Sequence, residues 1–151
     1  MRKKKEIVVC TSGGFDPIHV GHLRMFSAAK KLGDLHIVIL NNDNWLLKKK
    51  QRCFMTTKER KEILESISSV DKVMITRHPS NPKDMSIVSD LKRIRPRIYA
   101  NGGDRTVKNT PEKEVCEKLG IKMVFNVGGP KIRSSSELLK DYWNHKRKSP
   151  K

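Results

Sequence analysis

The amino-acid sequence predicts an α/β domain built on a parallel sheet of five strands, with helices on both faces. Short apolar runs alternate with segments of helical periodicity along the 151-residue chain, which is typical of repeated strand–helix–strand units. The first run, residues 7–10, contains no polar side chain, as expected of a strand buried on both faces. We expect residues 1–151 to form a single domain with its core at about 6–143.

The elements of the first half follow from periodicity and capping signals. In the first helix, Leu23, Phe26 and Ala29 recur every third residue, and Gly33 follows where the helix should end. The second helix opens with the capping-box pair Thr56 and Glu59. The expected strands here are residues 6–11, 35–40 and 72–76, and the expected helices are residues 21–32 and 56–68.

The second half continues the alternation. Thr110 and Pro111 supply a cap and a first-turn proline to one helix, and Gly120 marks its end. Three serines open the last helix. The expected strands are residues 97–100 and 121–127, and the expected helices are residues 83–94, 111–119 and 135–143.

Charge is the strongest feature of the composition. The chain has 33 lysines and arginines against 16 acidic residues, for a formal net charge of +17. Such an excess favours polyanionic partners, so nonspecific polyanion binding is one expectation; a solvated basic surface without a partner is the alternative. Part of the excess lies in two basic tails, residues 1–5 and 144–151, which we expect to be mobile.

The cysteines indicate a reducing compartment. Cys10, Cys53 and Cys116 are odd in number and show no Cys-x-x-Cys spacing, so we expect free thiols in a cytoplasmic protein. No apolar run approaches the ~20 residues of a membrane span, and we expect no membrane partner.

Residues 13–22, Gly-Gly-Phe-Asp-Pro-Ile-His-Val-Gly-His, lie where the first strand gives way to the first helix. Ligands of open α/β sheets bind at this edge, and the start of a helix offers unpaired N–H groups and a positive dipole end. His19 and His22 stand three apart there, and Gly21 between them leaves room for a ligand to approach the backbone. The segment therefore predicts a phosphate-binding site.

Residues 13–22 resemble the His-x-Gly-His signature of the nucleotidyltransferase superfamily, and within it the cytidylyltransferase-like family of glycerol-3-phosphate cytidylyltransferases and heptose-phosphate adenylyltransferases. The resemblance covers roughly residues 6–143, with further matches in the same order at residues 42–43, 48–52, 59–60, 102–104 and 134–136. It implies a Rossmann-like open sheet in the order 3-2-1-4-5, in which residues 13–22 and 101–105 face each other across one crevice.

The resemblance also implies a reaction: a phosphomonoester attacks the α-phosphorus of a nucleoside triphosphate and releases pyrophosphate. Because the nucleophile is already an anion, catalysis needs positioning and electrostatics rather than a general base. The implied catalytic residues are His19, His22 and Lys49, with Lys48, Lys50 and Arg52 as alternatives to Lys49. The chain has no metal site of its own, so Mg²⁺ is expected to arrive with the triphosphate.

The other site residues implied by the resemblance fall into two groups. Asp16 belongs to both, although a turn-forming role is an equal alternative for it. The implied acceptor-binding residues are Asp16, Asp43 and Arg60. The implied nucleotide-binding residues are Gly13, Gly14, Phe15, Asp16, Gly21, Gly103, Asp104, Arg133, Ser134, Ser135 and Ser136.

The sequence departs from the family pattern at three positions, with Gly14 for a hydroxyl residue, Gly129 for an arginine and Arg133 for an isoleucine. The choice between CTP and ATP stays open, because residues 102–104 are most like those of heptose-phosphate adenylyltransferases, whereas the lysine-rich segment and the length favour CTP. The expected assembly is a homodimer. The alternative function is a nucleic-acid-binding module that uses the basic surface of the same fold.

Overall fold

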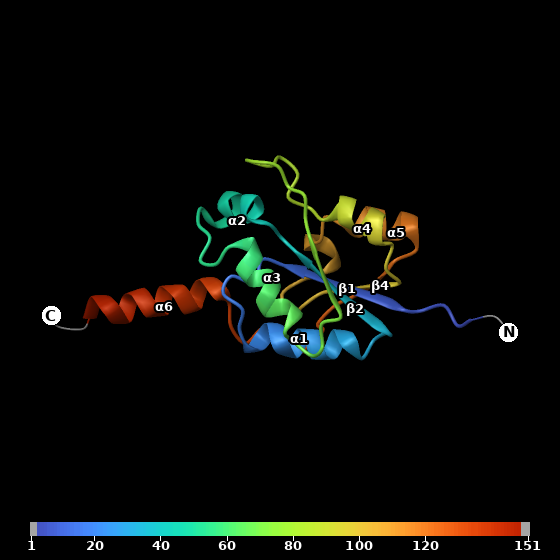
Figure 1. The fold of residues 1–151 in the computed structure, drawn as a ribbon, viewed down its shortest axis with the longest axis horizontal. Helices are drawn as coiled ribbons and strands as arrows, with labels where there is room; N and C mark the ends of the chain where they lie inside the picture. Colours follow the sequence, from blue (N-terminus) through green and yellow to red (C-terminus); the bar gives the residue numbers. More distant parts are fainter. Residues whose placement is uncertain (1–2, 149–151) are drawn as a thin grey trace.

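The computed structural model describes residues 3–148 and contains a five-stranded, all-parallel sheet in the order β3-β2-β1-β4-β5 (Figure 1). In the central pair, β1 and β2 run in register from Val8 beside Leu35 to Gly13 beside Leu40. The chain crosses from one half of the sheet to the other between β3 and β4, so the switch point lies between β1 and β4. The predicted fold class and strand order are confirmed.

The strands and helices of the described residues have the following bounds. The strands are β1 (Val8–Gly13), β2 (Leu35–Leu40), β3 (Lys72–Ile75), β4 (Ile98–Ala100) and β5 (Lys122–Val124). The helices are α1 (Val20–Lys30), α2 (Asp43–Lys50), α3 (Thr57–Glu65), α4 (Val88–Ile94), α5 (Lys113–Leu119) and α6 (Ser135–Lys148), with a short 3₁₀ turn, η1 (Val107–Asn109).

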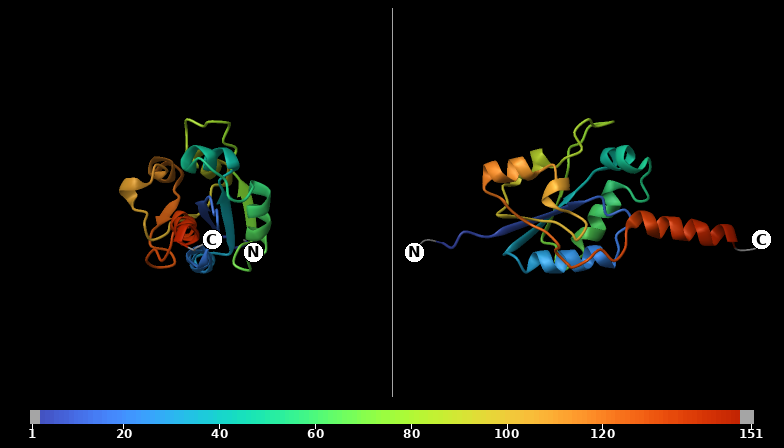
Figure 2. Two further views of the ribbon diagram at one scale, coloured as in Figure 1. Left: turned by 90° about the vertical axis from the view of Figure 1, so that its left-hand side faces the viewer. Right: turned by 180° about the vertical axis from the view of Figure 1, so that it is seen from behind.

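Helices cover both faces of the sheet (Figures 1 and 2), and an apolar layer lies between the helices and the sheet on each face. On one face, Phe26 of α1 and Leu64 of α3 pack with Val38 and Leu40 of β2. On the other face, Leu91 of α4 and Val115 of α5 pack with strand residues that include Ile37 and Ile39. Successive residues of β2 thus serve opposite layers, which is why this strand is apolar throughout.

The main difference from the prediction concerns the lysine-rich segment 48–52, which lay outside the expected helices and whose first three residues form the end of α2. Asn42 caps this helix by accepting a hydrogen bond from the N–H of Trp45, and Lys48–Lys50 form its last turn. Cations are favourable there because the carboxyl end of a helix carries partial negative charge. The helix fixes the direction of each lysine, and neighbouring lysines therefore point to different places.

Smaller corrections concern helix starts and the carboxyl-terminal tail. The expected helix 83–94 begins only at Val88, and the expected helix 111–119 begins at Lys113 because Thr110 bonds back to Thr106 O instead of capping it. The expected strand 121–127 spans only Lys122–Val124. Residues 144–148, predicted to be a mobile tail, continue α6, and this helix projects away from the body (Figure 2). Residues 1–2 and 149–151 of the predicted tails lie outside the described part.

Candidate active site

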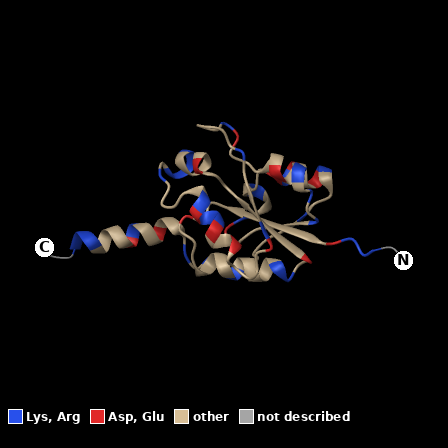
Figure 3. Cartoon of the chain, in the orientation of Figure 1, with Lys and Arg blue, Asp and Glu red and all other residues tan. Residues whose placement is uncertain are grey.

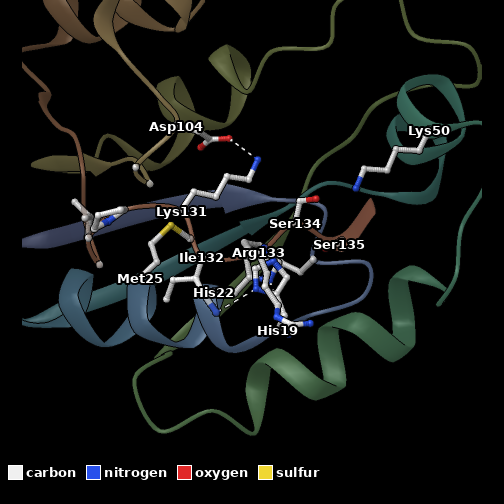
Figure 4. Close-up of a pocket in the computed structure, with 18 residues that line it drawn as sticks. His19, His22, Met25, Lys50, Asp104, Lys131, Ile132, Arg133, Ser134 and Ser135 are labelled. Atoms are coloured by element: carbon white, nitrogen blue, oxygen red, sulfur yellow. Dashed lines mark hydrogen bonds and ion pairs between the residues drawn. The ribbon is translucent and has the colours of Figure 1, made fainter. Parts of the chain in front are cut away.

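A pocket of about 230 Å³ lies at the carboxyl ends of β1 and β4, at the switch point of the sheet (Figure 4). We call it the main pocket. One wall is the start of α1, a second is the 102–104 turn after β4, and the third is the segment 127–135 that leads into α6. This is the position that the sequence predicted for ligand binding, because both parallel strands end at the same edge.

His19 and His22 form the floor of the main pocket and cap α1 reciprocally. The N–H of Gly21 donates to Nδ1 of His19 (3.1 Å), and the N–H of His19 donates to Nδ1 of His22 (3.2 Å). The two rings stack with their centroids 3.8 Å apart. Because each Nδ1 accepts a hydrogen bond, the proton of each neutral ring must sit on Nε2. The pair therefore offers two Nε2–H donors to an anion.

The surroundings keep both rings neutral. Burial, with smaller contributions from His19 and Lys50, lowers the pKa of His22 to about 3. Burial also lowers the pKa of His19, with help from the cations Lys131 and Arg133. The histidines are thus set to donate hydrogen bonds without carrying a charge of their own before an anion binds.

These shifts predict that acid destabilises the fold. As the pH falls below 6.5, unfolded chains protonate His22, whereas the folded state does so only near pH 3; stability is therefore lost on the acid side of pH 6.5. The slope for one such group is up to about 1.4 kcal/mol per pH unit, reduced here because the ring is only half-buried. We expect urea unfolding from pH 7 to pH 5 to show a shallower loss for His22→Asn than for the natural chain; equal slopes would contradict this assignment.

Phe15 holds the histidine pair from below. Its ring meets the edge of His22 at a centroid distance of 4.9 Å and that of Phe26 at 5.1 Å. Its backbone φ is +50°, which is rare for a residue with a bulky side chain and costs about 1–3 kcal/mol. A Cβ on Gly13 would stand 2.8 Å from the Phe15 ring, so the glycine makes room for it. Gly13 thus supports the site indirectly and does not line the main pocket.

The third wall of the pocket was largely missed from the sequence. Gly128 has a φ of +87°, and a Cβ there would stand 2.7 Å from Cα of Met25 in α1. A Cβ on Gly103 would stand 2.6 Å from O of Gly129, so the 102–104 turn and the 127–133 segment touch at the backbone. The two turns therefore close the pocket over α1. The consecutive glycines Gly128 and Gly129 were the feature of the sequence that could have indicated this close backbone contact.

Three cations converge on the main pocket: Lys50 from α2, and Lys131 and Arg133 from the segment before α6 (Figure 4). Burial lowers the pKa of Lys50, with added repulsion from Arg52 and Lys131 and an opposing effect of Asp16. Lys131 bonds Asp104 across the pocket mouth at 3.2 Å. This arrangement suits a ligand with several negative charges.

Lys49 and Ser136 do not line the main pocket. Lys49 is exposed and lies on a separate hollow with Trp45 and Lys83, so the structure places Lys50 where the sequence expected Lys49. The other two serines do line the pocket. Ser134 caps α6 by accepting from the N–H of Glu137, and the hydroxyl of Ser135 donates to O of Pro17.

The structure also places Asp16, Asp43 and Arg60 away from the main pocket. Arg60 is 1% exposed and donates to O of Gly14, O of Asn41 and Oδ1 of Asp43. Burial alone would raise the pKa of Asp43, but the hydrogen bonds from Arg60 and Thr57 outweigh it and lower that pKa.

Asp16 accepts the N–H groups of Phe54 and Met55, which anchors the segment after α2. Gly14 is tightly packed, since a Cβ there would stand 2.8 Å from Cδ2 of Leu46. These contacts tie residues 14–16 to α2 and α3, and they favour a structural role for Asp16 and Gly14.

Two further hollows adjoin the 102–104 turn and share Asp104 and Arg105, and together we call them the side groove. Its near part is lined by Ser12, Tyr99 and Asn101. Its far part is lined by Lys49, Lys83 and neighbouring residues, and Arg105 lines both parts. The site thus has two compartments on either side of one turn.

Metal sites and membrane-spanning helices were also sought in the described residues. Within residues 3–148, no group of three or more His, Cys, Asp and Glu side chains is placed to hold a metal ion. In the same range, no helix is both long and apolar enough to cross a membrane.

Comparison with known proteins agrees with the geometry. The FAD synthase of Thermococcus sibiricus is 36% identical over 122 residues, which cover 80% of this chain and 79% of that protein. The bifunctional protein HldE of Syntrophotalea carbinolica is 31% identical over 142 residues, which are 91% of this chain but only 27% of HldE. This chain therefore spans about a quarter of that relative.

Solved structures show the same fold at lower identity. The lipopolysaccharide core biosynthesis protein from Thermoplasma volcanium matches with a TM-score of 0.64 at 22% identity, over 80% of this chain and 96% of that one. The pantoate-beta-alanine ligase of Francisella tularensis matches with a TM-score of 0.57 at 16% identity, over 99% of this chain and 74% of that one. The family model for cytidylyltransferase-like proteins matches residues 10–140, and the chain belongs to this family of nucleotidyltransferases.

Proposed function

We propose that this protein transfers AMP or CMP from ATP or CTP to a small phosphomonoester and releases pyrophosphate. The observation that carries the proposal is the convergence on one pocket of two neutral Nε2–H donors with Lys50, Lys131 and Arg133. A pocket of this kind suits a triphosphate, whose charge needs both directed donors and compensating cations.

The proposed mechanism is electrostatic. The phosphomonoester oxygen attacks the α-phosphorus, a new P–O bond forms, and the bond from the α-phosphorus to the bridging oxygen breaks. His19 and His22 donate to the α-phosphate and the bridging oxygen, where negative charge increases in the transition state. Lys50, Lys131, Arg133 and the serines at the start of α6 hold the β- and γ-phosphates that leave as pyrophosphate.

We assign the two compartments to the two substrates. The main pocket would hold the triphosphate, and the side groove would hold the acceptor, with its phosphate directed past Arg105 to the α-phosphorus. Gly103 and Asp104 lie between them and would contact the nucleoside. Lys49 then belongs to the acceptor side, with Lys83.

This assignment predicts different effects for two neighbouring lysines. Lys50→Ala removes a cation from the main pocket and should lower kcat by about tenfold to a hundredfold, because its contact strengthens as the leaving group gains charge. Lys49→Ala should leave kcat within about threefold and act on the KM of the acceptor. The variants lose the same charge, so each controls for the other in steady-state assays. A large loss of kcat only in Lys49→Ala would instead identify Lys49 as the catalytic lysine, as the family resemblance implied.

Activity should require Mg²⁺. Bound to the triphosphate, the ion would neutralise phosphate charge and orient the leaving group, held by substrate oxygens and water. We expect excess chelator to abolish pyrophosphate release and added Mg²⁺ to restore it. Full activity in chelator would show that the cations of the main pocket suffice alone.

The identity of the substrates is tested by a panel. FAD joins AMP to FMN, a phosphomonoester, and FAD synthases are among the relatives, so ATP with FMN is the first pair to assay. Sugar phosphates and polyol phosphates with each of the four triphosphates complete the panel, with pyrophosphate release as the readout. Release with at least one pair supports the proposal; release with none, from folded protein with Mg²⁺, would refute it.

We further propose a homodimer in the cytoplasm that can bind polyanions nonspecifically. All three cysteines are free thiols, which supports a reducing compartment. Light scattering of the purified protein tests the dimer, and a monomeric mass across the working concentration range would refute it.

A further inference from the structure

A further hollow, separate from the main pocket and the side groove, lies beside α6. It is lined by Arg52, from the segment after α2, and by five residues of α6: Ser136, Lys140, Trp143, Asn144 and Arg147. We call it the α6 groove. Three of its six lining residues are cations, and none is acidic.

The cations of the α6 groove form one stripe. Lys140, Trp143 and Arg147 follow one another at spacings of three and four, which puts them on the same face of the helix. Asp141 falls on another face, and Glu137, three residues before Lys140, accepts the N–H of Ser134 and forms no ion pair with Lys140. Throughout residues 3–148, no carboxylate forms an ion pair with the side chain of Arg52, Lys140 or Arg147, whereas seven other cations are paired. The cations of the stripe therefore carry positive charge without an ion-pair partner, on a helix that projects from the body (Figure 3).

An aromatic ring lies within this stripe. Trp143 is 53% exposed, although tryptophan usually buries most of its surface. Its ring contacts Tyr142, at a centroid distance of 5.9 Å, and Lys146, whose Nζ lies 5.6 Å from the centroid. An exposed indole beside cations is the combination with which proteins bind single strands, because bases stack on the ring while the cations contact phosphates.

The spacing of the cations favours a strand over a single nucleotide. Residues 136–147 span roughly 16 Å along the helix axis at about 1.5 Å per residue. A mononucleotide gathers its phosphates at one point and would leave much of this stripe without a partner. A strand distributes one charge per nucleotide along its length, as the stripe does.

We propose that the α6 groove binds single-stranded nucleic acid, with bases stacked on Trp143 and phosphates held by Arg52, Lys140 and Arg147. This site is separate from the main pocket and is an addition to nucleotidyl transfer. Part of the net charge of +17 would thus serve nucleic-acid binding at this groove.

The test is fluorescence anisotropy of a short labelled oligo(U) strand with the full chain over a series of salt concentrations. The triple variant Arg52→Ala, Lys140→Ala and Arg147→Ala should weaken binding at least tenfold. It should also make the salt dependence shallower by about 2 in log–log slope, since each phosphate contact to a single strand contributes about 0.7.

A matched control removes three exposed cations elsewhere. Lys72→Ala and Lys122→Ala alter the first residues of β3 and β5, at the amino ends of these strands. Lys92→Ala alters α4. This triple variant loses the same charge and should weaken binding less than about threefold. Equal weakening by the two triple variants would mean diffuse attraction and would overturn the proposal.

The ring is tested separately. Trp143→Ala should weaken binding about tenfold with little change in salt slope, because stacking releases no counterions. Pyrophosphate release should be unchanged in Trp143→Ala, so failure here is distinguishable from failure of the proposed enzyme. Tighter binding to duplex than to single strand, or a halved mass of Trp143→Ala in light scattering, would assign α6 to another partner and overturn the proposal.

Discussion

His19→Ala and His22→Ala are each expected to lower kcat/KM at least about 100-fold, equivalent to ~3 kcal/mol or more of transition-state stabilisation. Both rings present Nε2–H to the main pocket because both Nδ1 atoms already accept backbone hydrogen bonds. These donors meet charge that grows at the α-phosphate and bridging oxygen during reaction. The loss should therefore fall mainly on kcat, measured by pyrophosphate release.

Two controls separate catalysis from folding. Leu23→Ala alters an exposed residue on the same helical turn and should leave kcat/KM within about threefold. Gln at position 22 keeps an amide N–H near the place of Nε2, so His22→Gln should retain more activity than His22→Ala. Near-normal turnover in both alanine variants, with thermal unfolding unchanged, would exclude the proposed mechanism.

Arg60→Met is expected to destabilise the fold by about 2–4 kcal/mol, because buried carbonyl acceptors lose their donor, whereas the half-exposed carboxylate of Asp43 can still be solvated. The guanidinium donates to the carbonyls of Gly14, Asn41 and Met55 and to the carboxylate of Asp43. Methionine fills similar volume but leaves these acceptors without donors. Urea unfolding at neutral pH measures the change.

The neighbouring residue supplies the control. Lys61 forms an exposed pair with Glu65 at 3.3 Å, so Lys61→Met should change stability by less than about 0.5 kcal/mol. Arg60→Lys should be intermediate, because it keeps the charge and loses the fork of donors. If Arg60→Met were as stable as the natural chain and lost affinity for the acceptor, the sequence-based assignment of Arg60 to substrate binding would hold instead.

The sequence predicted the β–α alternation well because buried parallel strands such as Leu35–Leu40 are continuous apolar runs. The strand order required the family resemblance, since alternation alone does not specify which strands are neighbours. Helix α2 was missed because it buries only Leu46 and so has no apolar stripe. Its cap at Asn42 and its terminal lysines were visible signals.

The site was predictable where local sequence builds it and not where distant segments meet. His19 and His22 reach the main pocket because a strand, a turn and a helix start fix them within a few residues. Lys50 needed the helical phase of α2 to distinguish it from Lys49. The buried position of Arg60 depends on residues 17 and 19 positions away, Asp43 and Asn41, and on Gly14. No local pattern encodes such contacts.

Transfer of a nucleotidyl group to a phosphomonoester can be followed by the position of a radioactive label. The natural chain is incubated with Mg²⁺, the active acceptor and a triphosphate labelled with ³²P at either the α- or the γ-phosphorus. Nucleotidyl transfer places the α-label in the acceptor product, in a form resistant to phosphatase, and releases the γ-label entirely as pyrophosphate. Transfer of the γ-label to the acceptor, or an acceptor product without the α-label, would contradict it.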